Sequence, residues 1–273
     1  MTTSEKGDGA RRSKRAGDAT RKTATRRRGE GSVDPNAPYW LWGAHAAGAA
    51  LANPEREVLE VWATKNAADK LSADQVARAD LKDASPKDIA QKLPDAAVHQ
   101  GLAVRVRPLE GLTLDEVAQT DGPIVLLDEV TDPQNVGAIF RVAVAFGAVG
   151  VVLQSRRSAA INGTLAKAAA GALETVAEVR CVNLARAIDA LRDADWNVVG
   201  LAGESATPID EAVSPSRGKL ALVIGAEGKG IRPSVANACS TLARIPISAA
   251  MESLNVSNAG AIALYEASRS RLG

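Results

Sequence analysis

The chain has 273 residues, 46% hydrophobic and 24% charged, a composition typical of a globular protein with one large or two smaller domains. No apolar run reaches the roughly 18 residues of a transmembrane helix, and the two cysteines and two histidines lie too far apart for a disulfide framework or a clustered metal site. The net charge of +1 hides an asymmetry: residues 1–30 hold ten Lys or Arg against four acidic residues, which leaves +6 there and −5 in the rest.

Residues 1–36 are predicted to form a disordered basic tail. They show no hydrophobic period and are rich in Arg, Lys, Gly, Thr and Ser, so burial cannot offset the entropy of ordering them. The segment lacks the apolar stretch of a secretory signal. Its Arg, Thr and Ala content faintly resembles a mitochondrial transit peptide, but its four acidic residues and its lack of large apolar residues argue against that role. The two cysteines also fit a reducing cytoplasm.

A small α/β unit is predicted over residues 37–107. It begins at Tyr39, continues with a helix to Leu51 and a strand over Val58–Ala63, and then contains helices rich in Ala, Asp and Lys, one of which starts at Ser85. An alternating strand over Leu102–Val106 closes the unit. Residues 108–121 are predicted to be a linker.

A different pattern begins at residue 122 and extends to 273. Continuous apolar runs alternate with helical patterns, which favours a parallel α/β sheet covered on both faces. The helices are predicted from the Asp132-Pro133 start and over 163–170 and 183–194. The predicted strands are Ile124–Leu127, Val149–Leu153, Asn197–Leu201 and Leu220–Ile224.

Three segments of this second unit could carry chemistry. The first, 132–141, places Asn135 in the first turn of a helix and Arg141 about two turns later. The second, 224–230, follows a strand and holds three glycines, which allow close backbone approach to a ligand, although its spacing is neither that of a Rossmann fingerprint nor that of a P-loop. The third, 251–261, crowds Ser253 and Asn255 at a helix start. A surface arginine, a flexible turn and a plain helix cap are the respective alternatives.

Taken together, the three segments resemble the signature motifs of the SpoU/TrmH family of RNA ribose 2′-O-methyltransferases. The matching residues are Asn135 to Arg141, Gly225-Ala226-Glu227-Gly228, and Ser253-Leu254-Asn255-Val256-Ser257. This family belongs to the SPOUT class, whose α/β fold carries a C-terminal trefoil knot. Gly43-Ala44-His45, Asn53-Pro54 and His99-Gln100-Gly101 also resemble the small N-terminal domain, similar to ribosomal protein L30e, of the subgroup that modifies a guanosine of 23S ribosomal RNA. The resemblance covers roughly residues 39–272.

The resemblance implies methyl transfer from S-adenosylmethionine to a ribose 2′-hydroxyl of 23S rRNA, by a cytoplasmic homodimer that needs neither a metal nor a membrane. It places Arg141 beside the target hydroxyl, with Asn135, Glu227, Ser253 and Asn255 as orienting groups, some of them acting across the dimer. The cofactor would lie against Ile224, Gly225, Ile245, Pro246, Ile247, Leu254 and Asn255.

Two alternatives share the predicted fold. The substrate could be a tRNA, or the protein could be a non-catalytic RNA-binding or ribosome-assembly factor. A dinucleotide-dependent oxidoreductase does not fit the glycine spacing.

Deletion of residues 1–33 is expected to weaken RNA binding chiefly at low salt, because a +6 segment attracts phosphates non-specifically and salt screens that attraction. Cofactor binding should not change. The measurement is RNA affinity against salt concentration for the full-length and truncated proteins. Equal affinities and equal salt slopes would show that the tail contributes only to solubility.

Overall fold

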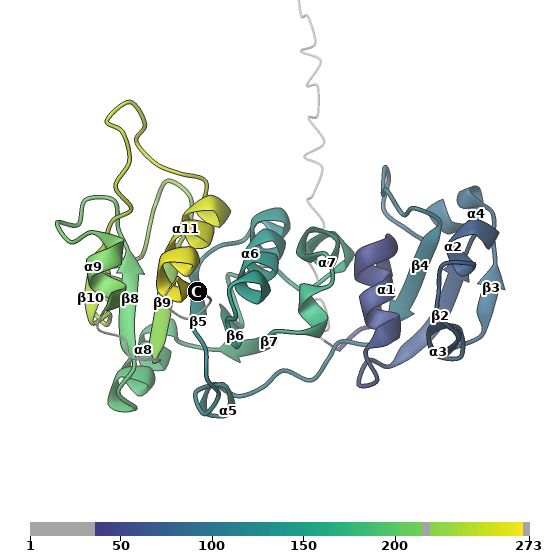
Figure 1. Cartoon of the computed structure of the whole chain (residues 1–273), viewed down its shortest axis with the longest axis horizontal. Helices are drawn as coiled ribbons and strands as arrows, with labels where there is room; N and C mark the ends of the chain where they lie inside the picture. The colour runs from purple at the N-terminus through teal and green to yellow at the C-terminus, as the bar shows by residue number, and fades with distance from the viewer. Residues whose placement is uncertain (1–35, 215–218, 270–273) are drawn as a thin grey trace, which may run out of the picture. The chain divides into compact units, whose positions relative to one another are not determined.

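The computed structural model describes residues 36–214 and 219–269, and these residues form two separate β-sheets (Figure 1). The first sheet has four strands in the order β1-β4-β2-β3, and the second has six in the order β10-β8-β9-β5-β6-β7. Residues 1–35 of the predicted basic tail lie outside the described residues.

The four-stranded sheet is formed by the segment predicted as a small α/β unit. Its strands are β1 (Tyr39–Trp42), β2 (Val58–Ala63), β3 (Leu81–Asp83) and β4 (Leu102–Val106), of which only β2 and β3 pair in parallel. Helix α1 (Ala44–Ala52) packs against β1 and β4. The short helices α3 (Ala73–Val76) and α4 (Pro86–Ala90) each start with a capping box, at Ser72 and Ser85, and α2 (Lys65–Ala68) precedes them.

The segment predicted as a linker contains one helical turn, α5 (Leu114–Val117). Thr113 and Glu116 form its capping box, and the buried Val117 packs into the second sheet's core. Leu112 forms an isolated bridge with Val179. Residues 108–121 therefore contact the second sheet.

The six-stranded sheet is parallel throughout, as the continuous apolar runs predicted. Because β9 inserts between β8 and β5, the strand order reverses beside β5, and the carboxyl ends of β5 and β9 lie next to each other. The strands are β5 (Ile124–Asp128), β6 (Gly150–Gln154), β7 (Ala177–Cys181), β8 (Asn197–Leu201), β9 (Leu220–Gly225) and β10 (Thr241–Ala243).

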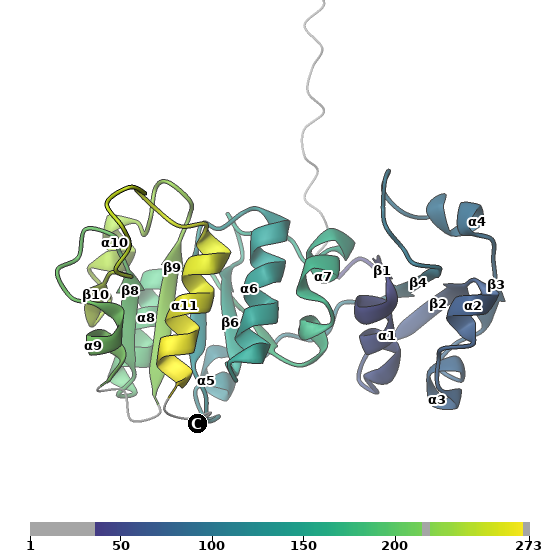
Figure 2. The ribbon, with the colours of Figure 1, turned by 45° about the horizontal axis from the view of Figure 1, so that its top comes forward.

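Helices cover both faces of this sheet, and alternate strand residues enter two cores. Val125 and Leu127 join the core under α6 (Pro133–Ala145), α7 (Gly163–Ala169), α9 (Ile209–Val213) and α11 (Val256–Ser268). Ile124 and Leu126 join the core under α8 (Leu184–Asp193) and α10 (Pro233–Ala236). Figure 2 shows α6 and α11 side by side on the first face.

The predicted strands and long helices are confirmed to within one or two residues. The sequence did not predict β7 and β10, which are the edge strands of the large sheet. Edge strands lie partly in solvent, so they lack the continuous apolar run that marks the central strands. Strand β7, for example, exposes Arg180 and leaves Glu178 half-buried.

Gly137 is required by close helix packing. A β-carbon at this position would lie 2.4 Å from the carbonyl oxygen of Leu165 and 2.6 Å from the β-carbon of Ala168 on α7. The glycine of the first motif therefore allows α6 and α7 to approach each other closely.

A buried ion pair joins the two sheet regions. Arg56, which is 2% exposed, donates to both carboxylate oxygens of Glu174, at 3.0 and 2.7 Å. It also donates to the main-chain carbonyl of Arg107 at 2.9 Å, and Asn53 donates to Glu174 at 2.9 Å. Glu174 lies in a single 3-10 turn, η1 (Ala172–Glu174), just before β7. The guanidinium and the carboxylate thus compensate each other's loss of solvation.

Arg56→Ala is expected to lower the free energy of unfolding by about 3–5 kcal/mol, because it leaves the buried Glu174 carboxylate without its ionic partner. Arg107→Ala is the matched control. Its pair with Glu57 is about half exposed, so removing it should cost about 0–1 kcal/mol. Urea unfolding of both variants measures the difference, and equal losses would contradict a structural role for the buried pair.

Candidate active site

The three sequence motifs converge where the strand order of the large sheet reverses. Asp128 at the end of β5 pairs in register with Gly225 at the end of β9, so the loops that leave both strands emerge at one edge. The first motif begins α6 after β5, the second follows β9, and the third leads into α11. In open parallel α/β sheets this edge is where ligands bind.

One side chain from each motif joins a single hydrogen-bonded cluster. Glu227 Oε1 accepts from Asn255 Nδ2 at 2.5 Å and from Asn135 Nδ2 at 3.3 Å, while Asn255 Nδ2 also donates to Asn135 Oδ1 at 3.0 Å. The same Glu227 oxygen accepts from the main-chain N–H of Val256 at 3.3 Å. We call Asn135, Glu227 and Asn255 the amide–carboxylate cluster.

Asn255 has two roles, one on each side of its amide. Its oxygen caps α11 by accepting from the main-chain N–H groups of Ser257, at 3.0 Å, and Asn258, at 3.3 Å. Its nitrogen donates to Glu227 and Asn135. The plain capping role considered for this motif is therefore present, and the residue also fixes the cluster.

Gly225 is required by a tight turn. A β-carbon there would lie 2.1 Å from the carbonyl carbon of Gly230, and the turn is closed by Gly230 N–H donating to the carbonyl of Ala226 at 2.9 Å. The turn directs Glu227 back toward α6 and α11. Gly225 thus has a structural reason that is independent of any ligand.

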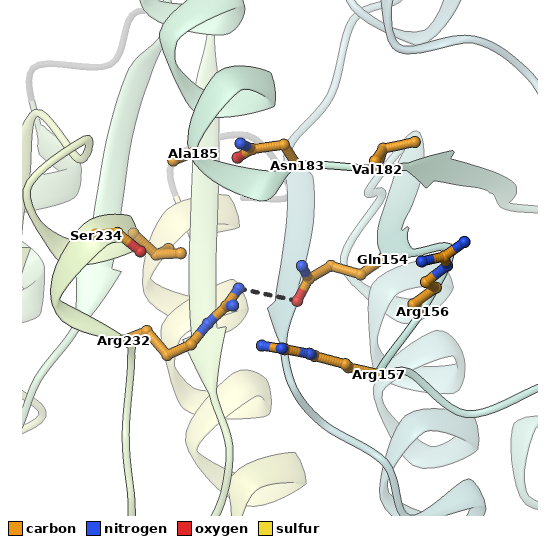
Figure 3. A pocket seen from close by; sticks show the side chains of 9 residues that line it. Gln154, Arg156, Arg157, Val182, Asn183, Ala185, Arg232 and Ser234 are labelled. Carbon is orange, nitrogen blue, oxygen red and sulfur yellow. Dashed lines mark hydrogen bonds between the residues drawn. The ribbon is translucent and has the colours of Figure 1, made fainter.

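A second polar cluster at the same edge was not predicted from the sequence. Asp128 is fully buried and accepts from the main-chain N–H of Arg232 at 2.8 Å and from its guanidinium at 2.8 and 2.5 Å. These hydrogen bonds raise the pKa of Arg232. Arg232 also donates to Gln154 at 3.0 Å (Figure 3). The sequence does contain one signal for this cluster, because Asp128 is a charged residue at the end of an otherwise apolar strand.

Arg141 and Ser253 do not join the amide–carboxylate cluster. Arg141 is exposed on α6, about 9 Å along the helix axis from Asn135, and it forms no hydrogen bond or ion pair with the residues that the structure describes. Ser253 is exposed in the loop before α11. Within one chain, the predicted catalytic arginine therefore lies apart from the amide–carboxylate cluster, which contains three of the four predicted orienting groups.

The residues predicted to hold the cofactor differ in burial. Ile224 is buried beneath α11, Ile245 and Leu254 are half-buried, and Pro246 and Ile247 are exposed, with Ile247 at 41%. They come from the end of β9, the loop after β10 and the loop before α11, all at the carboxyl edge of the sheet. Across residues 36–214 and 219–269, the main-chain N–H groups of Ile245 and Ile247 donate to no protein acceptor.

Two cavities lie at this edge and share Arg157. One, of about 370 Å³, is lined by Glu129, Thr131, Arg157, Ala226, Glu227 and Lys229. The other, of about 320 Å³, is lined by Gln154, Arg156, Arg157, Val182, Asn183, Ala185, Arg232, Ser234 and Val235 (Figure 3).

The described residues offer no group of three or more His, Cys, Asp or Glu side chains that could bind a metal ion. Among the same residues, no helix is long and apolar enough to cross a membrane. Burial raises the pKa of both Cys181 and Cys239 to about 11, so these thiols are protonated at neutral pH and are poor nucleophiles.

Comparison with known sequences gives matches along nearly the whole described chain. Residues 122–265 match the SpoU rRNA methylase family. The 23S rRNA (guanosine-2′-O-)-methyltransferase RlmB of Photobacterium profundum is 39% identical over 243 residues, 85% of this chain and 97% of that protein. The protein of the same name from Escherichia coli K12 is 38% identical over 241 residues, 85% of this chain and 98% of that protein.

Solved structures share the fold. An rRNA methyltransferase from Sinorhizobium meliloti superimposes with a TM-score of 0.73 at 23% identity, covering 86% of this chain and 88% of that one. The SpoU methyltransferase AviRb from Streptomyces viridochromogenes, solved in complex with the cofactor AdoMet, gives a TM-score of 0.69 at 22% identity, covering 86% and 91%.

Asn255→Asp is expected to destabilise the protein by about 1–3 kcal/mol at pH 7, because it places a second carboxylate against Glu227. Repulsion raises the pKa of one carboxyl above its unfolded value, so the deficit is present at neutral pH and shrinks as the pH falls toward 4. The control is Asn258→Asp, an exposed position in the first turn of the same helix. Unfolding at both pH values measures the effect, and a pH-independent deficit would contradict the carboxylate contact.

Proposed function

The chain belongs to the SpoU rRNA methylase family, and on that premise we propose that it transfers a methyl group from S-adenosylmethionine to the ribose 2′-hydroxyl of a guanosine in 23S rRNA. The observation that carries this proposal is the match to two 23S rRNA guanosine methyltransferases along 97% and 98% of their length. A match of that extent includes the small N-terminal unit as well as the parallel sheet.

The residues at the carboxyl edge of the large sheet fit S-adenosylmethionine. Its adenine needs main-chain partners and apolar walls, and the N–H groups of Ile245 and Ile247 are available within the described chain, next to the partly exposed side chains of Ile247 and Leu254. We assign Ile224, Gly225, Ile245, Pro246, Ile247, Leu254 and Asn255 to the cofactor site. When bound, S-adenosylmethionine supplies a methyl group on a positively charged sulfur, which is a good leaving group.

The chain's own residues contribute by positioning the two reactants. Asn135, Glu227 and Asn255 hold the starts of α6 and α11 and the loop after β9 in one arrangement, so that groups bound at this edge meet in a fixed geometry. Holding two reactants in line is worth about 7–11 kcal/mol of the activation barrier. Ser253, in the loop before α11, is assigned to the same positioning task.

Arg141 is the proposed catalytic residue. An arginine side chain stays a cation in proteins, so Arg141 stabilises the negative charge that develops on the 2′ oxygen as this oxygen releases its proton to water and takes up the methyl group. Arg141 is exposed and lies apart from the amide–carboxylate cluster. This separation supports a homodimer in which Arg141 of one chain completes the site of its partner.

The remaining proposals follow the family resemblance. Residues 37–107 form an L30e-like domain that binds RNA, residues 108–121 link it to the methyltransferase domain, and residues 122–273 contain a trefoil knot. The packing of α11 against both α6 and β9 supports the proposal of a knot. The cytoplasm is the protein's proposed location.

Purified protein is expected to transfer labelled methyl groups from S-adenosylmethionine to protein-free 23S rRNA, and mapping of 2′-O-methyl positions identifies the nucleotide. Arg141→Ala should lower turnover by a factor of about 100 or more, the usual loss on removal of one group that stabilises developing oxyanion charge. Calorimetric titration should show unchanged cofactor binding.

Methylation of tRNA but not of 23S rRNA would indicate that the protein is a tRNA methyltransferase. RNA binding with neither methyl transfer nor cofactor binding would indicate a non-catalytic RNA-binding or assembly factor. An active Arg141→Ala enzyme would remove Arg141 from the catalytic role.

A further inference from the structure

The 320 Å³ cavity between β6, α8 and α10 collects positive charge. Arg156, Arg157 and Arg232 line it, and no carboxylate does so within the described chain. Figure 3 shows the side chains of Arg157 and Arg232 pointing toward one another from opposite walls. One oxygen of the Glu129 carboxylate contacts both of these guanidinium groups, so the charge that remains uncompensated at the cavity comes chiefly from Arg156.

The three arginines differ in how fully they are compensated. Arg232 is held by the buried Asp128 and contacts Glu129 at 3.3 Å, while Arg157 donates once to Glu129 at 2.9 Å. Arg156 forms no hydrogen bond or ion pair with any described residue, and it is exposed. Three cations against two carboxylates leave a net charge of +1 at the cavity, with Arg156 and most of the Arg157 guanidinium available to a ligand.

The start of α8 adds further donors to the same cavity. Asn183 caps this ten-residue helix through its side-chain oxygen, which leaves its amide nitrogen available, and Ala185 of the first turn also lines the cavity. First-turn N–H groups and the helix dipole favour an anion at this position. Phosphate suits the set, because arginine forks bind its oxygens in pairs.

The position of this cavity relative to the candidate active site identifies the source of the phosphate. Arg157 also lines the neighbouring 370 Å³ cavity, whose wall includes Glu227 of the amide–carboxylate cluster. We propose that the 320 Å³ cavity binds a phosphodiester of the RNA strand next to the nucleotide being methylated, with Arg156 and Arg157 as its principal contacts. This inference rests on the proposed function, since it takes the RNA strand to run past Glu227.

The test uses a transcribed fragment of 23S rRNA containing the methylated guanosine, and the full-length protein with Arg156→Ala, Arg157→Ala or both. Each single variant should weaken RNA binding about 3- to 10-fold at 0.1 M salt and reduce the slope of log affinity against log salt by about 0.7, the value for one lost phosphate contact with a single strand. Arg192→Ala is the control. It removes an arginine from the opposite end of the same helix and should leave affinity and slope at wild-type values.

A synthetic RNA with one neutral methylphosphonate linkage identifies the phosphate. One linkage beside the target guanosine should weaken wild-type binding as much as the double variant does, and should cause no further loss in the double variant. Wild-type salt slopes in both arginine variants would overturn the inference. If inorganic phosphate competes for the cavity while no single linkage has an effect, the ligand is a free anion, which also overturns it.

The outcome is separable from that of the methyl-transfer assay, because RNA binding, cofactor binding and turnover are measured independently. A wild-type protein that transfers no methyl group but shows the arginine-dependent salt slope would refute the proposed function and retain the phosphate site. If the wild-type protein methylates 23S rRNA and the arginine variants keep the wild-type salt slope, the proposed function is retained and the phosphate site is refuted.

Discussion

The parallel pairing of β5 with β9 is the constraint on which the rest of the site depends. Asn135 and Asn255 are 120 positions apart in the sequence, and they meet because these two strands end at the same edge, where the order of the sheet reverses. Neither the first nor the third motif has a binding geometry of its own. Each acquires one when its helix, α6 or α11, starts from that edge.

Two paired carboxylates, the buried Asp128 and the exposed Glu227, convert this placement into a fixed geometry. Asp128, fully buried, is neutralised by Arg232 and so fixes the chain just after the second motif. Glu227 concentrates three donors on one oxygen, two from side chains and one from the main chain of α11. Because an unpaired carboxylate at the buried Asp128 would be costly, its contact with Arg232 favours one arrangement of that loop. The exposed Glu227 cluster adds hydrogen bonds that join the starts of α6 and α11.

Much of the fold could be predicted because its signals are local. The apolar runs that became β5, β6 and β9 are buried on both faces, and helix starts such as Asp132-Pro133 and Ser85-Pro86 cap their own chain. The edge strands β7 and β10 gave weaker signals, because only part of each lies in the core. The contact between Arg56 and Glu174 joins two segments 118 positions apart, and nothing in either segment specifies the other.

The sequence by itself determined the fold class, the three motifs and the chemistry that they resemble, since apolar period, capping and residue type are properties of short segments. Only the tertiary structure decided that Asn135, Glu227 and Asn255 share one cluster and that Arg141 stands apart from it. It also assigned Gly137 and Gly225 to close packing and a tight turn. The physical reason is that side chains distant in sequence are brought together by strand order and helix packing, which depend on the burial of the whole core.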